Sequence, residues 1–272
     1  MNIVIFSKNR SCQLDALLRS LKKNFAEYDT SFVSVIWKGN RGFKGGYTKI
    51  KNKFPEVNMI SEDNFKQQTI GCIDELQTHT MFLVDDILFK MPFSEADDQV
   101  KSLSLLNLNL CVSLRLDKNT TYCYAGSHNQ QVPISGTEKV PMWDWSNAEG
   151  DWGYPMSLDG NIYLTKLIKK IVRTTDFSNP NELESKLDMF ARQNTAHLPR
   201  KMTCYADRSR LFNVPANRVQ DVFENRVEDS YTVEDLNKKF YKEGMVIDIS
   251  YLDGVRNNAC HYPFKYEFVE EE

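Results

Sequence analysis

Residues 1–18, MNIVIFSKNRSCQLDALL, decide the fold class of this chain. They contain an unbroken apolar run at 3–6, which is typical of a strand buried on both faces of a sheet. Leucines then recur at helical spacing after Ser11, which stands in the N-cap position of the helix they predict. The stretch therefore predicts a buried strand, a polar turn at 7–10 and an amphipathic helix.

Later segments repeat this pattern. Residues 32–36 (FVSVI) and 80–84 (TMFLV) predict two further strands, and residues 64–78 carry a helical pattern between them. Strands that alternate with helices in this way are typical of a parallel sheet wrapped by helices. Residues 110–116 (LCVSLRL) predict one more strand.

The second half of the chain is less periodic. Residues 118–150 are polar, aromatic and contain glycine, which predicts a long functional loop. Helices are predicted from Asp159, from Asn181 with Glu184 as a capping pair, and from Thr232 with Asp235. Because no repeat or linker interrupts the pattern, we expect one domain over 1–272, with a first part at 1–95 and a second at 96–272.

The composition excludes several classes of protein. The chain has 272 residues, of which 41% are apolar and 26% charged, as in a globular protein with a sizeable core. A net charge of −3 provides no basic excess for nucleic acid. The first apolar run is too short for a signal peptide, and no stretch reaches the length of a membrane span. We therefore expect a cytoplasmic protein.

Six widely spaced cysteines form no C-x-x-C pair. In a chain of this length they predict reduced, packed thiols rather than a disulfide framework or a zinc site.

Two adjacent acids follow the strand predicted at 80–84. In FLVDDILF, Asp85 and Asp86 stand where ligands of open α/β sheets gather, at the carboxyl end of a strand. Carboxylates there suit Mg²⁺ or Mn²⁺ together with a substrate diphosphate. Such a cation would offset the negative charge that grows on a diphosphate leaving group. The alternative is that both acids only end the strand and face water.

Aromatic and acidic residues gather at 143–154. This segment contains Trp143, Asp144, Trp145, Trp152 and Tyr154. Aromatic faces stack on sugar rings and carboxylates accept hydrogen bonds from hydroxyl groups, so the mixture suits a sugar acceptor site. The alternative is a small core beneath the loop, with tryptophan present for its bulk.

Taken together, these segments resemble nucleotide-sugar glycosyltransferases of the GT-A fold, in a bacterial and viral branch. The resemblance rests on SKNR after the first strand, the helix that follows, and the acids at the position of the DXD motif. Here the triplet is Val84-Asp85-Asp86, which departs from the motif at its first position. The resemblance implies a Rossmann-like mixed α/β sheet flanked by helices, with an acceptor-side region towards the C-terminus.

The resemblance also implies roles for residues of the donor half. Ser7, Asn9 and Arg10 would hold the nucleotide, with the Arg10 fork suited to phosphate oxygens. Trp37 and Lys38, at the end of the second strand, would contact the nucleoside. Asp85 would lie near the ribose, and Asp86 would bind Mn²⁺ or Mg²⁺.

Further roles fall in the second half. Asp159, as an acid opening a helix after the metal motif, would be the general base of an inverting enzyme. Asp151 and Asp144 are rival bases, and His261 is a possible metal ligand. The segments at 179–184, 217–220 and 258–261 carry the rest of the resemblance.

The expected function is metal-assisted transfer of a sugar, with inversion, from a UDP- or GDP-sugar to a glycan or glycoprotein hydroxyl during glycan biosynthesis. One alternative is a sugar-phosphate nucleotidyltransferase, but FSKNRSCQL contains none of the glycines that such enzymes use around phosphate. Another is a sugar-binding or virion surface module, which would have no use for acids at a strand end.

Overall fold

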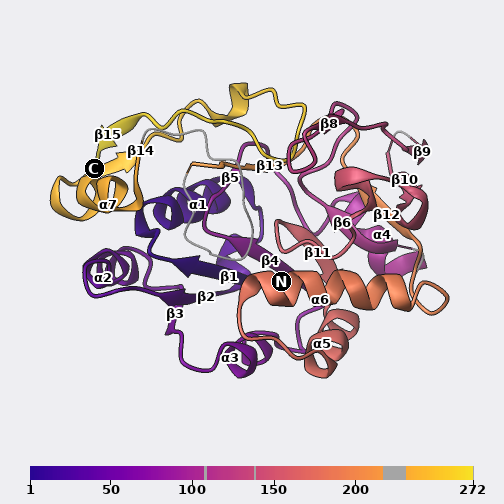
Figure 1. Cartoon of the computed structure of the whole chain (residues 1–272), viewed down its shortest axis with the longest axis horizontal. Helices are drawn as coiled ribbons and strands as arrows, with labels where there is room; N and C mark the ends of the chain where they lie inside the picture. Colours follow the sequence, from indigo (N-terminus) through magenta and orange to yellow (C-terminus); the bar gives the residue numbers. More distant parts are fainter. Residues whose placement is uncertain (107–108, 138, 217–230, 272) are drawn as a thin grey trace.

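A nine-stranded mixed sheet forms the centre of the computed structural model (Figure 1), which describes residues 1–106, 109–137, 139–216 and 231–271. In sheet order the strands are β3 (Asn58–Ser61), β2 (Phe32–Lys38), β1 (Asn2–Lys8), β4 (His79–Val84), β11 (Asn161–Leu164), β6 (Asn109–Ser113), β12 (Lys201–Cys204), β10 (Pro141–Asp144) and β9 (Ser135–Gly136).

Strands β11 and β10 run opposite to their neighbours, and the other strands of the sheet share one direction. Strands β3, β2, β1 and β4 are mutually parallel, and the sequence predicted β2, β1 and β4 as strands of a parallel sheet. Strand β11 then runs antiparallel to both β4 and β6, so β6 points the same way as β1. Since β12 is parallel to β6, the sheet continues through both predicted parts of the chain.

Alternation along the strands produces two cores. Ile3 and Ile5 of β1 pack on one face of the sheet, and Val4 and Phe6 pack on the other. The first face is covered by α1 (Ser11–Asn24), α2 (Lys44–Lys53) and α4 (Asp98–Leu106). The second is covered by α3 (Phe65–Gly71), α5 (Thr165–Thr174) and α6 (Pro180–Gln193), which lie together below the sheet in Figure 1.

Smaller elements surround the sheet. Three two-stranded sheets pair β5 (Ile87–Phe89) with β13 (Leu211–Asn213), β14 (Met245–Ile247) with β15 (Phe268–Glu270), and β7 (Tyr122–Cys123) with β8 (His128–Asn129). Helix α7 (Val233–Asn237) begins with the capping box predicted for Thr232 and Asp235. The six cysteines are free and buried, as predicted. No helix within the described ranges is long and apolar enough to cross a bilayer.

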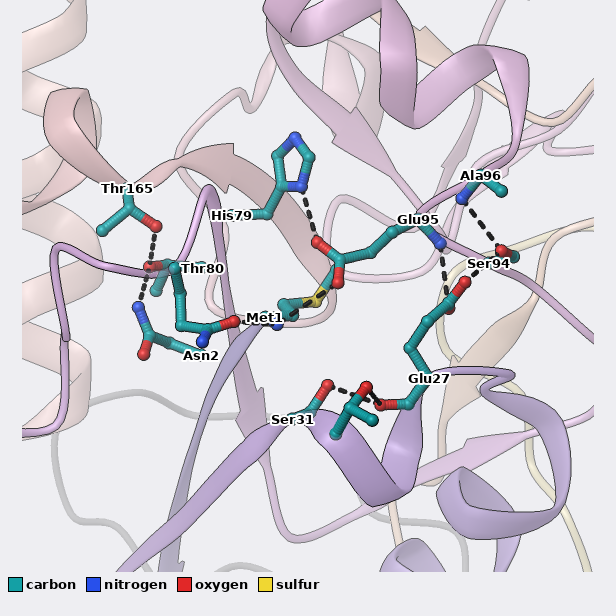
Figure 2. Close-up of polar contacts among 12 residues, drawn as sticks. Met1, Asn2, Glu27, Ser31, His79, Thr80, Ser94, Glu95, Ala96 and Thr165 are labelled. Carbon is teal, nitrogen blue, oxygen red and sulfur yellow. Dashed lines mark hydrogen bonds and ion pairs between the residues drawn. The ribbon is translucent and has the colours of Figure 1, made fainter.

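Polar contacts fasten the amino edge of the sheet (Figure 2). The amine of Met1 lies 3.2 Å from Glu95, whose other oxygen lies 2.7 Å from Nδ1 of His79 at the start of β4. The backbone of Glu95 in turn donates to the carboxylate of Glu27. The network therefore ties β1 and β4 to the segment that leads into α4.

Two sequence predictions about helix starts are wrong. Asp159 opens no helix: it lies in a turn before β11, and α5 begins only at Thr165. Apolar residues of β11 continue into those of α5, so a strand and a helix together imitate one helical pattern. The cap of α6 is Asn179, whose side chain accepts a hydrogen bond from the backbone of Glu182, rather than Asn181.

The sequence also left residues 41–63 without an element, and there the structure has α2 and β3. Both carry weak apolar patterns. Only Gly46, Tyr47 and Ile50 of α2 are buried, and edge strand β3 has no fully buried residue. The helix predicted over 64–78 is shorter, because α3 ends at Gly71. The predicted loop at 118–150 contains the short strands β7 to β10.

Substitution of the observed cap tests the start of α6. We expect Asn179→Ala to lower the free energy of unfolding by about 1 kcal/mol, because the backbone amide of Glu182 loses its acceptor. The matched control, Asn181→Ala, lies inside the helix and should change it by no more than about 0.5 kcal/mol. Urea unfolding followed by circular dichroism measures both. Equal losses in the two variants would contradict the assignment of the cap.

Candidate active site

The topology brings four segments to the carboxyl edge of the sheet. Strands β1, β4 and β6 end there, and β11, which runs the opposite way, begins there. Asn9 and Arg10, the Asp85–Asp86 pair, Arg115 and Asp159 therefore converge on one edge, although they are far apart in sequence.

An arginine bridges the two predicted metal-site acids. One nitrogen of Arg10, Nη1, lies 3.1 Å from Asp85 Oδ1 and 3.0 Å from Asp86 Oδ2. The second oxygen of Asp85 accepts a hydrogen bond from the backbone amide of Lys8 at 3.0 Å. Asp85 is buried, and Asp86 keeps 21% of its side chain exposed. Asp86 is therefore the acid of this pair that remains open to a ligand.

Burial and charge act against each other in this group. Burial lowers the pKa of Arg10, but the charges of Asp85 and Asp86 outweigh it and leave the pKa above its ordinary value. Burial raises the pKa of the Asp85 carboxyl to about 6, and Arg10 offsets part of that rise. Arg10 is therefore a permanent cation at this edge, held in place by the carboxylates it neutralises.

The other predicted donor residues surround Tyr47, which the sequence analysis missed. The hydroxyl groups of Ser7 and Tyr47 are 2.7 Å apart, and the backbone amide of Arg10 donates to the Tyr47 hydroxyl at 3.2 Å. The Trp37 ring stacks on the Tyr47 ring with centroids 4.5 Å apart. Because α2 has only a weak apolar pattern, nothing local in the sequence marked Tyr47 as a neighbour of this turn.

Asn9 and Lys38 hold adjacent turns. Asn9 adopts a left-handed backbone with φ of 58°, and its side-chain oxygen accepts a hydrogen bond from the Asn40 amide at 2.9 Å. Lys38 is exposed and forms an ion pair with Glu62 at 2.6 Å. The predicted donor residues therefore lie together around the carboxyl ends of β1 and β2.

A second group of site residues centres on Asn213, at the end of β13. Its side-chain amide donates to Asp86 Oδ1 at 3.2 Å, and Asn213 lies close enough to Asp159 to lower the pKa of that carboxyl, against the larger rise that burial causes. His261 lies beside Asn213, because the backbone amide of Tyr262 donates to the Asn213 carbonyl at 2.9 Å. The structure thus places Asp86, Asp159 and His261 around one asparagine, which no motif had indicated.

Asp159 is held by a buried arginine. Arg115 Nη1 lies 3.4 Å from Asp159 Oδ2, and its Nη2 lies 3.9 Å from Asp151 Oδ1. Burial raises the pKa of Asp159, the proximity of Arg115 and His261 lowers it, and Asp86 raises it again, with a net rise. A raised pKa makes Asp159 a stronger base than a carboxylate at a helix start would be. Arg115 was detectable in the sequence as a cation inside the apolar run at 110–116.

Gly160 permits the close approach of β13 to this turn. Its φ is 84°, and a Cβ placed there would lie 2.3 Å from Cδ2 of Leu211. Only glycine avoids both the backbone strain and this contact. The backbone after Asp159 can therefore press against the strand that carries Asn213.

The donor set fits a divalent cation only in part. Within the described residues, no three His, Cys, Asp or Glu side chains are grouped as metal ligands. Each Asp86 oxygen accepts one hydrogen bond, which leaves the carboxylate further lone pairs for a cation. Nδ1 of His261 is buried without a hydrogen-bond partner. A hard cation that keeps water and diphosphate oxygens as its other ligands suits such a sparse protein site.

The predicted stacking role of the tryptophans is wrong. Trp143, Trp145 and Trp152 are at most 1% exposed and belong to the core that also contains α5 and α6. Each indole nitrogen donates to a backbone carbonyl, at 2.8, 3.0 and 3.0 Å respectively. The rings therefore offer no face to a sugar. They form the small core that the sequence analysis left as the alternative.

The remaining acceptor candidates are separated by the fold. Asp144 caps a short 3-10 helix (Trp145–Asn147) and forms an ion pair with Arg200 at 2.9 Å. Asp151 exchanges two hydrogen bonds with Gln130. Tyr154 is half-buried near Asp159, whose charge contributes to the raised pKa of the tyrosine after burial and neighbouring acids. Of this set, Tyr154 and Asp151 lie beside the Asp159 group.

An open cavity of about 1020 Å³ lies away from these residues. It is lined by the end of α1, the start of α4 and the segment between β12 and β13, and by none of the predicted site residues. The candidate active site therefore rests on the convergence of side chains rather than on this cavity.

The whole chain aligns with part of the bifunctional glycosyltransferase pgtA of Dictyostelium discoideum, at 30% identity over 302 residues. The chain spans 38% of the length of that relative. No protein-family model matches the chain.

Solved structures are similar in fold. S. aureus TarS 1–349 matches with a TM-score of 0.50 at 13% identity, over 79% of this chain and 61% of that one. TarS 1–349 in complex with UDP matches with a TM-score of 0.50 at 15% identity, over 79% and 62%. The sequence of this chain is therefore similar to part of a glycosyltransferase, and its fold is similar to that of TarS.

The predicted fold, a mixed α/β sheet flanked by helices, is thus confirmed, and TarS 1–349 shares it. Of the segments in the second half of this chain that carried the resemblance, 217–220 lies outside the described residues. The segment at 179–184 forms the start of α6, and 258–261 lies beside β13.

Glu184 of α6 is a further acid of this site that the sequence analysis interpreted only as a cap. Its Oε1 accepts a hydrogen bond from the Leu158 amide at 2.9 Å. Burial, and then the charge of Asp159, raise the pKa of Glu184 from 4.5 to about 7. Its ionisation therefore costs stability, which is fully present below pH 4.5 and is lost as the pH rises through about 7.

The direction of this pH dependence of stability can be tested with Glu184→Gln, which keeps the hydrogen-bond acceptor and cannot ionise. We expect the variant to gain melting temperature relative to wild type as the pH rises from 4.5 to about 7, measured by thermal unfolding. The control is Glu182→Gln in the same helix. Contacts with Ser178 lower the pKa of Glu182, so its variant should instead lose stability at neutral pH. A pH-independent difference for Glu184→Gln would contradict the assignment.

Proposed function

We propose that this chain transfers a sugar from a nucleotide-diphosphate donor to a hydroxyl group of a glycan, with inversion at the anomeric carbon. The observation that carries the proposal is the meeting of Asp86 and Asp159 around the Asn213 amide. Asp86 is suited to a cation that binds the donor diphosphate, and Asp159 is suited to accept the proton of the acceptor hydroxyl. The full-length similarity to part of a glycosyltransferase supports the same reaction class.

The donor would lie across the carboxyl ends of β1, β2 and β4. There Arg10 supplies a permanent positive charge, and the Trp37 and Tyr47 rings form a stacked aromatic pair beside it. The TarS structure of similar fold contains UDP, which supports a UDP-sugar as the first donor to test. GDP-sugars are the second.

Mn²⁺ or Mg²⁺ would supply charge neutralisation for the departing diphosphate. Asp86 is the protein ligand proposed for it, and the unpartnered Nδ1 of His261 is the second. Asp85 would keep Arg10 in place rather than contact the metal, because its carboxylate is buried whereas that of Asp86 is partly exposed.

Asp159 would accept the proton of the attacking hydroxyl. Arg115 orients this carboxylate, and the raised pKa of Asp159 strengthens it as a base. Asp151 is the reserve candidate, since it contacts the same arginine. A binding module without catalysis would gain nothing from an acid held in this way.

Replacement of Asp86 tests the donor side. We expect Asp86→Asn to lower transfer at least about a hundredfold, because a neutral amide is a poor ligand for the divalent cation that would neutralise the departing diphosphate. Transfer is measured with a panel of nucleotide sugars and added Mn²⁺. The matched control, Asp29→Asn, replaces an exposed acid and should keep wild-type turnover. Wild-type turnover of Asp86→Asn in chelator-treated buffer would remove the metal from the proposal.

Replacement of Asp159 tests the acceptor side. Asp159→Asn should reduce transfer by about 10²-fold or more, while the dissociation constant of the donor nucleotide, from calorimetry, stays unchanged. Asp144→Asn, which alters an acid paired with Arg200, should transfer normally. If Asp151→Asn were inactive and Asp159→Asn active, Asp151 would be the base. If neither mattered, the reaction would proceed with retention.

A further inference from the structure

Helix α5 presents an entirely basic outer face. Its sequence, TKLIKKIVRT, contains four cations and no acid, within a chain of net charge −3. The apolar residues Ile168, Ile171 and Val172 are buried against the sheet. The four cations, Lys166, Lys169, Lys170 and Arg173, line one shallow hollow together with Glu75. The four positive charges are therefore concentrated on one surface, although the chain as a whole has a negative net charge.

A rigid turn at residues 74–77 presents a leucine beside this face. Glu75 lies 3.3 Å from both Lys169 and Arg173, and the amide of Thr165 donates to the Thr78 carbonyl, so the turn lies against α5. Leu76 is 89% exposed. Its backbone amide donates to Asp74 Oδ1 at 3.0 Å, which holds the tip of the turn in place.

We propose that the outer face of α5 and Leu76 form a docking surface for an anionic lipid membrane. Lysine side chains are attracted to acidic headgroups, and an apolar side chain at the tip can enter the boundary between headgroups and acyl chains. Lys166 and Lys170 are exposed and form no ion pair with any described residue, so both are available for headgroups. A nucleic-acid surface is less suited, because the face has no aromatic ring on which a base could stack.

Docking in this orientation leaves the candidate active site accessible. Helix α5 packs on the core of one sheet face, whereas β5 and β13, which flank Asp86, pack on the core of the other. The surface would therefore hold the enzyme near a membrane-attached acceptor without covering the donor residues. The docking itself does not depend on the proposed transfer reaction.

Vesicle sedimentation with the whole chain tests the proposal. The probes are vesicles of phosphatidylcholine alone and vesicles with about a third phosphatidylserine. We expect binding only to the second kind, and weaker binding as salt is added. Lys166→Gln combined with Lys170→Gln should lower the partition coefficient about 25-fold, since each cation contributes about fivefold. Leu76→Ser should lower it about tenfold.

The matched control is Lys118→Gln combined with Lys139→Gln, which removes two exposed lysines at the separate cavity. It should bind acidic vesicles as the wild type does, and circular dichroism should show all variants folded. The proposal is overturned if the wild type does not bind acidic vesicles, if it binds both vesicle types equally, or if both double variants lose binding equally. Preference for a DNA duplex, lost in Lys166→Gln with Lys170→Gln, would assign the surface to nucleic acid instead.

Discussion

The ion pair between Arg10 and the two acids after β4 is the interaction on which the site depends. It joins the turn before α1 to the turn after β4 through one guanidinium nitrogen. Removal of one partner from a buried pair typically costs about 3–5 kcal/mol, because the other charge is left uncompensated. The carboxyl edge is therefore a fixed charge arrangement, prepared before any substrate binds. Asp86 extends it to β13 through Asn213.

The antiparallel direction of β11 explains how Asp86 and Asp159 come to the same edge of the sheet. In an all-parallel sheet, every strand begins at the edge opposite to the ligand site. Because β11 runs antiparallel between β4 and β6, its first residues lie at the carboxyl edge, and Asp159 directly precedes it. Arg115 follows β6 at the same edge and holds Asp159 from the neighbouring position. The mixed sheet thus places a carboxylate where a parallel sheet would place only strand ends.

The buried tryptophans anchor the segment that precedes Asp159. Trp152 donates to the backbone carbonyl of Thr120, and Trp143 donates to that of Trp152, so the long segment before Asp159 is anchored in the core. Asp151, which is buried, lies in this anchored segment next to Arg115. The aromatic cluster therefore contributes to the site through rigidity rather than through contact with a ligand.

The sequence alone determined three of the four strands in the parallel half of the sheet, the strand-end position of Asp85 and Asp86, and the turn that carries Arg10. These features follow from local periodicity, because a doubly buried strand requires an unbroken apolar run and its polar residues can follow only at its ends. Tertiary structure alone decided that Trp143, Trp145 and Trp152 are buried, that Asp159 precedes a strand, and that Tyr47, Asn213 and Glu184 join the site. Burial and pairing between segments distant in sequence depend on which faces meet. A local pattern of residue types does not specify which faces meet.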